Sequence, residues 1–278
     1  VGVPLSVGVS SRLANIGRQV EKGCNGTIKY AFLYKPKERV NWTTSVTFRH
    51  GTAYYDKIGS KLDQYNRQNL SKSLTRYYDG GSPSALWTVR SEGIDPATGR
   101  EIFLRKDGTR VFSYSYDDEV EVGDTRPKLE GVIGNVLYLK GFSCSVYVRY
   151  SFGADAFNST LYDKVENISA AGLQSNQDKR ALYDRWKQPG DRAKYKGISL
   201  TESTPMSSRF VQKNNYLVLE SIRLAYEFEQ RWMEKIRFSG MTVSAYMNDI
   251  CRFSTIKDER GIDYPFARSV SFAISFNF

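Results

Sequence analysis

The sequence predicts an all-β, antiparallel fold of the transmembrane-barrel class, and three features support this prediction. The last ten residues alternate strictly, with small or polar residues between Val270, Phe272, Ile274, Phe276 and Phe278. The chain holds 19 Tyr and 15 Phe, yet no run approaches the ~20 apolar residues that a membrane-spanning helix needs. Short and long connections also alternate along the chain, as they do when turns lie on one side of a membrane and loops on the other.

A charged turn joins the first two predicted strands, residues 26–35 and 41–49. Pro36 interrupts the pattern between them, because proline cannot donate a hydrogen bond to a neighbouring strand. The two strands therefore predict a hairpin. Each strand carries its apolar side chains on one face: Ile28, Tyr30, Phe32 and Tyr34 in the first, and Trp42, Val46 and Phe48 in the second.

The alternation is lost after the second strand, and local signals replace it. The polar stretch 64–69 predicts a short helix, and residues 85–91 predict a short strand. Residues 93–99 have the composition of a turn, and the Asp-Gly step at 107–108 predicts a hairpin between two extended runs.

Five acidic residues precede Pro127. Their spacing is not that of an EF-hand, so a solvated acidic loop is favoured over a site for a divalent cation. They are Asp117, Asp118, Glu119, Glu121 and Asp124.

Further strands follow at 131–140, 142–152, 216–228 and 236–247, before the terminal one. The face of 131–140 is ambiguous, and 216–228 slips register near Leu219 and Glu220. The clearest of these strands places on one face Phe142, Cys144, Val146, Val148, Tyr150 and Phe152.

The connections between these strands differ in length. Turns near 36–40, 140–142 and 229–234 are short, and the long connections are 51–83, 92–130, 154–215 and 248–268. This asymmetry favours a membrane barrel, in which the long connections would be extracellular loops.

Composition argues against several classes of function. His50 is the only histidine, and Cys24, Cys144 and Cys251 lack metal-ligand spacing, so no metal, cofactor, disulfide framework or hydrolytic triad is predicted. The net charge is +10, but the basic residues are spread and no nucleic-acid-binding motif is present. A soluble surface β-sandwich that binds carbohydrate and a passive porin-like barrel remain alternatives, because both also contain alternating strands.

Five short motifs follow one another before the last strand. They are Gly93-Ile94-Asp95-Pro96-Ala97-Thr98-Gly99-Arg100-Glu101, Leu139-Lys140-Gly141-Phe142, Phe152-Gly153-Ala154-Asp155 with Phe157-Asn158, Ser207-Ser208-Arg209-Phe210-Val211, and Tyr264-Pro265-Phe266-Ala267-Arg268. Together they resemble the C-terminal part of SusC/RagA-type TonB-dependent outer-membrane transporters, along essentially all 278 residues.

The resemblance implies that residues 1–278 form about nine strands of a roughly 22-stranded barrel in the outer membrane of a Bacteroidota-like cell. The N-terminal plug, the TonB box and the early strands of such a transporter have no counterpart in this sequence. The resemblance further implies import of a glycan or a peptide, a SusD/RagB-like surface lipoprotein as lid, and the TonB complex as the energy source. No catalytic residue is expected.

Substrate contacts are expected from aromatic side chains in the loops, because flat apolar rings suit sugar rings and peptide side chains. The alternative is that these rings pack within their own loops or at the membrane interface. Arg185 and Asp191 are expected to tie down their loop. The candidate substrate-binding residues are Tyr77, Tyr78, Trp87, Tyr183, Trp186 and Tyr195.

Overall fold

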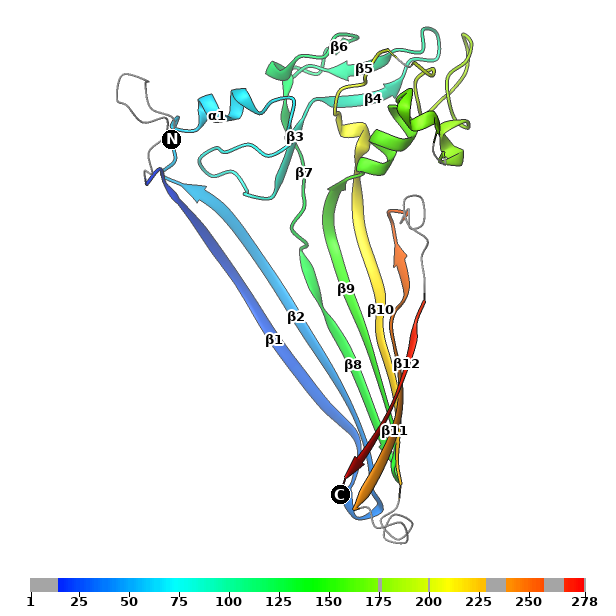
Figure 1. Ribbon diagram of the computed structural model, residues 1–278. Coiled ribbons are helices and arrows are strands. Elements are labelled where there is room, and N and C mark those ends of the chain that lie inside the picture. The colour runs from blue at the N-terminus through cyan, green and yellow to red at the C-terminus, as the bar shows by residue number, and fades with distance from the viewer. Residues whose placement is uncertain (1–14, 175–176, 200, 229–238, 258–267, 278) are drawn as a thin grey trace, which may run out of the picture.

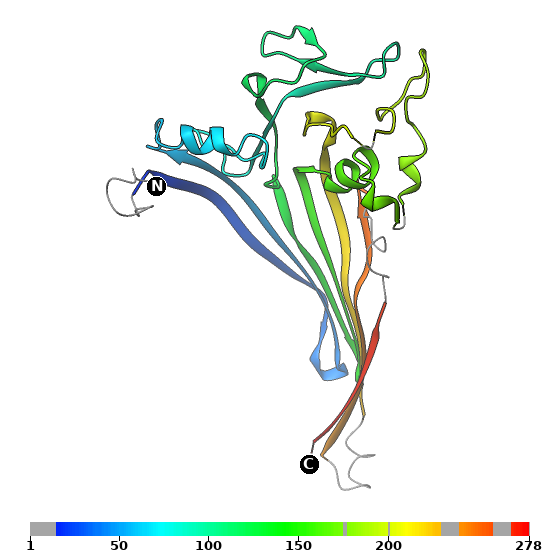
Figure 2. The ribbon, with the colours of Figure 1, turned by 45° about the horizontal axis from the view of Figure 1, so that its top comes forward.

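The computed structural model describes residues 15–174, 177–199, 201–228, 239–257 and 268–277. These residues form a long, curved antiparallel sheet that carries folded loops at one end (Figure 1 and Figure 2). Within them, no helix has the length and apolar character required to cross a membrane.

Seven strands make up the long sheet, in the order β1-β2-β8-β9-β10-β11-β12. All neighbouring pairs are antiparallel, so the prediction of an all-β, antiparallel fold is confirmed. Closure into a barrel and the total number of strands stay predictions. The strand bounds are β1 Arg18–Lys35, β2 Val40–Asp56, β8 Leu129–Leu139, β9 Phe142–Phe157, β10 Val211–Glu227, β11 Gly240–Ser254 and β12 Val270–Asn277.

The pairing register separates an apolar face of this sheet from a polar face. Residues paired directly across an antiparallel sheet lie on the same face, so each register position defines a row. A row of the apolar face joins Ile28, Val46, Ile133, Val148, Leu219 and Cys251. The next row, on the polar face, joins Thr27, Thr47, Val132, Arg149, Val218 and Arg252.

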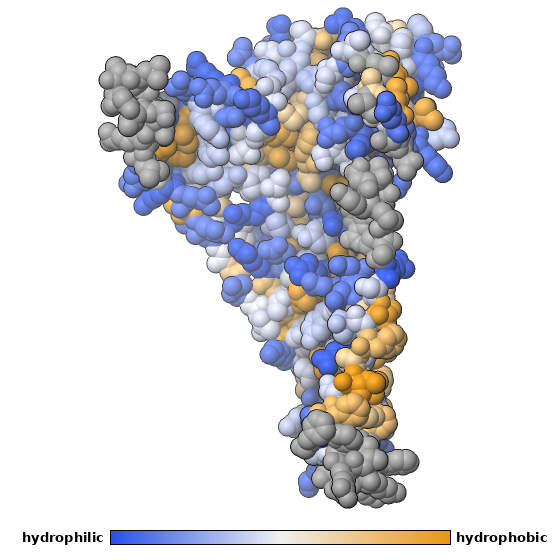
Figure 3. Space-filling view, viewed as in Figure 1, coloured by the Kyte–Doolittle hydropathy of each residue, from blue (hydrophilic) through white to orange (hydrophobic). Residues whose placement is uncertain are grey.

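The last strand continues the apolar face. Phe272 pairs with Ala245 and Ile274 with Val243, which extends the alternation predicted for both strands. Large apolar side chains of this face are uncovered by the described residues, since Phe272 and Ile274 in β12 are 77 % and 60 % exposed and Phe253 in β11 is 69 % exposed. Figure 3 shows apolar side chains gathered along β12. A soluble β-sandwich would bury them beneath a second sheet, so this exposure argues against that alternative.

Short turns lie where the strands converge, and long loops lie at the opposite, broad end (Figure 1). A 3₁₀ turn at Pro36–Glu38 joins β1 to β2, and Lys140 and Gly141 join β8 to β9. Gly141 has a φ of 94°, in the left-handed region that glycine enters without strain. The predicted asymmetry is confirmed for these turns, whereas the predicted turn at 229–234 lies outside the described residues.

Two bulges adjust the faces. The bulge between Leu219 and Ser221 in β10 confirms the predicted slip. A bulge between Ala31 and Leu33 in β1 was not predicted, and it places Tyr34 opposite Asn41 on the polar face. The prediction that Tyr34 shares the face of Ile28 is therefore wrong, because the extra residue reverses the alternation.

The strands also reach farther toward the loops than the alternation predicts. β9 continues to Phe157 instead of ending at 152, and β10 begins at Val211 instead of 216. At this end Ser151, Ala154 and Asp155 are all buried, so polar and apolar positions no longer alternate. Alternation marks a strand only where its two faces meet different surroundings.

The loops at the broad end contain two small sheets and one α-helix. Helix α1 spans Asp63–Gln68, as predicted. The predicted turn at 93–99 and the Asp-Gly hairpin are confirmed, since they join β4 to β5 and β5 to β6. The remaining elements are β3 Ala85–Thr88, β4 Arg90–Ile94, β5 Glu101–Leu104, β6 Arg110–Val111, β7 Val120–Asp124, and helical turns at Tyr116–Asp118, Leu161–Glu166, Ala171–Gln174, Lys179–Ala181 and Ser208–Phe210.

Candidate functional site

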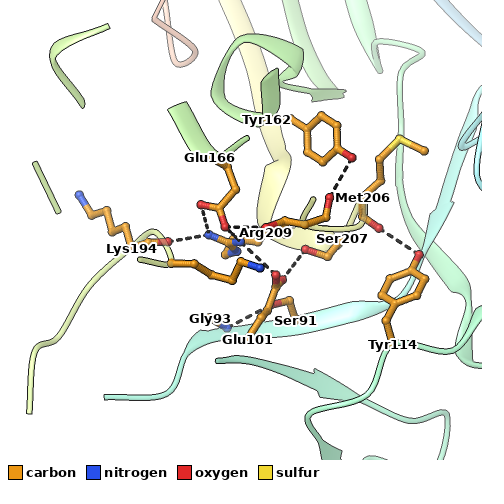
Figure 4. Close-up of polar contacts among 12 residues, drawn as sticks. Ser91, Gly93, Glu101, Tyr114, Tyr162, Glu166, Lys194, Met206, Ser207 and Arg209 are labelled. Carbon is orange, nitrogen blue, oxygen red and sulfur yellow. Dashed lines mark hydrogen bonds and ion pairs between the residues drawn. The ribbon is translucent and has the colours of Figure 1, made fainter. Parts of the chain in front are cut away.

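A buried ionic network ties the loops together at the broad end of the sheet (Figure 4). It joins Glu101 at the start of β5, Glu166 at the end of a helical turn, and Arg209 just before β10. Arg209 Nη2 lies 3.0 Å from Glu101 Oε2 and 2.7 Å from Glu166 Oε1. The side chains of Glu101 and Glu166 are 3 % and 0 % exposed, so the carboxylates depend on protein partners rather than on water.

Hydroxyl groups complete this network. Ser207 Oγ donates a hydrogen bond of 2.6 Å to Glu101, and Thr204 Oγ1 donates one of 3.1 Å to Glu166. Burial lowers the pKa of the Arg209 guanidinium, but the hydrogen bond to Glu166 and the charge of Glu101 outweigh it and raise the pKa above its ordinary value. Arg209 is therefore a permanently charged centre between two carboxylates.

Arg185 and Asp191 fix the segment beside the network, which confirms the role predicted for them. Arg185 is buried and donates to the carbonyl oxygens of Lys196 at 2.9 Å and Glu166 at 3.3 Å. Asp191 Oδ2 accepts hydrogen bonds from the backbone N–H groups of Lys187 and Gln188. Burial lowers the pKa of Arg185, and its carbonyl partners satisfy its donors.

A second buried pair corrects the prediction for the acidic stretch. Glu119 is 8 % exposed and forms a two-point ion pair with Arg76, with hydrogen bonds of 2.9 Å and 2.7 Å. Burial raises the pKa of Glu119, against the hydrogen bond and charge of Arg76. Glu119 thus belongs to a packed ion pair and not to a solvated loop. Among the residues that the structure describes, no cluster of metal-ligating side chains could hold a metal ion.

Two open cavities border the network, and the segment 192–199 contributes to both. The first, of about 420 Å³, is called the aromatic cavity, and its walls include Phe103, Phe112, Tyr114, Trp186 and Glu101. The second, of about 510 Å³, is called the arginine cavity, and its walls include Ile94, Leu161, Arg192, Tyr195, Arg209 and Phe210. Both volumes fall within the range of roughly 300–1,000 Å³ that is common for ligand sites.

Trp186 and Tyr195 are the two predicted substrate residues that line a cavity. The Trp186 Nε1 donates to the carbonyl oxygen of Pro96 at 2.9 Å, and its ring packs where a Cβ on Gly99 would lie. Tyr195 is 9 % exposed and belongs to a core cluster with Leu161 and Phe210. Burial raises the pKa of Tyr195 and also that of Tyr114, to about 12.

The other predicted substrate residues lie elsewhere. Tyr77 contacts Tyr55 and Tyr65, with ring centroids 5.4 Å and 5.6 Å apart. Tyr78 packs on Trp87 at 5.0 Å. Tyr183 is 65 % exposed and lines neither cavity. Tyr77, Tyr78 and Trp87 thus pack against other loop or strand-end aromatics, which is the alternative to substrate binding. A substrate role for all six residues stays a prediction.

Glu101, Glu166 and Arg209 are functional candidates that the sequence alone did not predict. Two signals were nevertheless present, since Glu101 ends the first of the five motifs and Arg209 lies in the fourth. The structure joins these two motifs directly through the ion pair between them. Glu166 lay in an aperiodic stretch that gave no signal.

Comparisons with known proteins identify the fold. No protein-family model matches the sequence, and no curated protein matches it. The chain is similar in structure to the RagAB peptide importer in its open-open state (TM-score 0.75, 19% identity) and in its closed-closed state (TM-score 0.76, 19% identity). A further structure of the RagAB peptide transporter gives a TM-score of 0.76 at 20% identity.

These similarities cover 100% of this chain and 31–32% of the chains it matches, so the chain spans about a third of their length. The likeness extends over the long sheet and the loops together, because the whole chain is covered. The chain therefore has the fold of a part of the RagAB transporter, in agreement with the SusC/RagA-type resemblance of its motifs.

Proposed function

We propose that the chain forms part of the wall and the outer loops of an importer in the outer membrane. The observation that carries this proposal is the apolar face, which runs across the strands of the long sheet and is uncovered by any other described element. In a transmembrane barrel such a face contacts lipid, and the polar face lines the lumen. The similarity to RagAB supports the same assignment.

Strand length fits this role. β1, β2, β9, β10 and β11 have 18, 17, 16, 17 and 15 residues, more than the roughly 9–11 that a tilted transmembrane strand needs. The excess extends toward the loops, where Ser151, Ala154 and Asp155 of β9 are buried by protein. The short turns would then lie on the periplasmic side and the loops with both cavities on the outside.

The two edges of the sheet imply further strands. β1 and β12 each pair on only one side within the described residues. An unpaired edge in hydrocarbon would cost several kcal/mol for each unsatisfied backbone group. Additional strands that close a barrel of roughly 22 strands would satisfy both edges.

The proposed substrate is a peptide rather than a glycan. The cavities combine apolar walls with cationic and anionic side chains, a mixture that suits the varied side chains and charged ends of peptides. The neighbouring structures are those of a peptide importer. A SusD/RagB-like lipoprotein would cover the loops, and the TonB complex would act through a part outside this sequence. No residue is assigned a catalytic role.

The test uses the complete transporter in cells, with uptake of a labelled peptide and of a labelled oligosaccharide compared. Accumulation of the peptide that stops when the proton-motive force is dissipated is the expected result. Uptake that survives dissipation would favour the passive porin-like alternative. Recovery of the protein in buffer without detergent would reject the membrane assignment altogether.

A further inference from the structure

The arginine cavity presents more positive than negative charge to a ligand. Arg192, Lys194 and Arg209 line it, whereas Glu92 is the one carboxylate among its described lining residues. Glu92 is already paired, since its Oε2 lies 2.6 Å from Arg110 Nε. The cavity thus has an excess of positive charge, and its acidic side chain is held by a residue outside the cavity.

The three cations differ in how far protein partners neutralise them. Arg209 is held by Glu101 and Glu166, although its Nε is buried without a hydrogen-bond partner in the described part of the chain. Lys194 faces Asp184 at 3.4 Å in an exposed pair. Arg192 is exposed and has no ion pair or hydrogen bond with any described residue. Arg192 is therefore the cation available to a ligand.

Most of the remaining wall of the cavity is apolar, and part of it belongs to a buried cluster. Leu161 is 6 % exposed, Tyr195 9 % and Phe210 1 %, and these residues form the core cluster of the loops. Phe157 and Tyr162 pack against the same cluster, so protein contacts hold its side chains in place. A preformed apolar wall beside a free guanidinium favours a ligand with an apolar group next to an anion.

We propose that the arginine cavity binds a carboxylate flanked by an apolar side chain, as at the C-terminal residue of a peptide. The inference rests on the proposed function and deepens it by naming the part of the peptide that is recognised. Arg192 receives the carboxylate, and the side chain of the same residue packs toward Leu161 and Tyr195. A neutral oligosaccharide lacks the anion, so it gains nothing from the excess of positive charge.

The experiment measures binding of short apolar peptides to the complete detergent-solubilised transporter by fluorescence anisotropy, with the dye at the peptide N-terminus. Three peptides are compared: a free acid, its C-terminal amide, and an amide that carries one internal Glu. The variants are Arg192→Gln and, as a matched control, Lys187→Gln. The control removes an equal charge from the same loop, but from a residue that lines neither cavity. Protease resistance of the loops checks that each variant is folded.

The free acid is expected to bind more tightly than the amide, and Arg192→Gln to weaken it about threefold to tenfold while Lys187→Gln does not. Binding of the Glu-containing amide that also depends on Arg192 would assign the carboxylate to a side chain instead of the terminus. Equal binding of acid and amide overturns the inference but upholds peptide recognition. Failure of all three peptides to bind rejects the proposed function itself.

Discussion

Substitution of Phe272 by Arg tests whether the apolar face contacts lipid or water. Phe272 is 77 % exposed and pairs across the sheet with Ala245, so its replacement removes little packing within the protein. On a surface in water, such a change alters the free energy of unfolding by about 0.5 kcal/mol or less. At mid-bilayer depth, arginine on the lipid face costs ~2–4 kcal/mol, a change of about 30- to 700-fold in the folding equilibrium.

The adjacent residue supplies the matched control. Ser271 pairs with Tyr246 on the polar face, so Ser271→Arg places the same side chain one position away in the proposed lumen. Ser145 on the same face would be a less suitable control, because it pairs with Arg223 and a second arginine there would add like-charge repulsion. Val148→Arg, between Ile133 and Leu219, is expected to behave like Phe272→Arg.

The assay is the heat-modifiable migration of the complete protein on gels, followed by urea unfolding in lipid vesicles. Folded protein is expected to be depleted for Phe272→Arg and retained for Ser271→Arg. Equal effects of the two substitutions would refute the assignment of faces, and two near-neutral effects would refute burial in lipid.

Three further predictions concern the loops. Glu101→Gln leaves Arg209 with one buried carboxylate, and we expect it to lower the free energy of unfolding by about 3 kcal/mol, measured as lost protease resistance. Glu92→Gln, in an exposed pair, should lower it by less than about 1 kcal/mol. The folded state raises the pKa of Tyr114 from 10.0 to about 12, so the unfolded chain releases this proton first and the free energy of unfolding falls as pH rises through that window. Tyr114→Phe should reduce this fall. An alkaline unfolding curve of the variant that matches that of the unsubstituted protein would contradict the prediction. Gly99→Ala is expected to destabilise the loops by at least about 1 kcal/mol, because φ is 71° and the new Cβ would lie 2.5 Å from the Trp186 ring; unaltered tryptophan fluorescence and protease resistance would argue against this.

The long sheet could be predicted because each strand carries its own signal. Phe272 and Ile274 alternate with small residues whether or not the neighbouring strand is known, and the slip at Leu219 breaks that period visibly. The bulge in β1 gave no such signal, because Ala31, Phe32 and Leu33 are all apolar. A one-residue insertion within an apolar run leaves the pattern ambiguous, and only the pairing partner decides which face each residue takes.

The site was less predictable because its contacts join distant segments. Arg76 and Glu119 are 43 residues apart, and Glu101 and Arg209 are 108 apart. Charged residues in polar loops are expected to be solvated, so nothing local marked Glu119 as buried. Their aromatic character made Trp186 and Tyr195 candidate substrate residues, and both line a cavity. It could not distinguish them from Tyr77, which packs against other tyrosines.

The ionic network also bears on how the loops keep one arrangement. Their cluster of buried apolar residues is small, comprising Leu161, Val165, Tyr195 and Phe210. Apolar contacts tolerate repacking, whereas a buried guanidinium between two carboxylates is stable only when both partners are in place. Because Arg209 lies two residues before the first residue of β10 and Glu101 begins β5, the network fixes the small sheet relative to the long one. The walls of both cavities include members of this network, so a ligand meets a preformed site rather than a loop that must first become ordered.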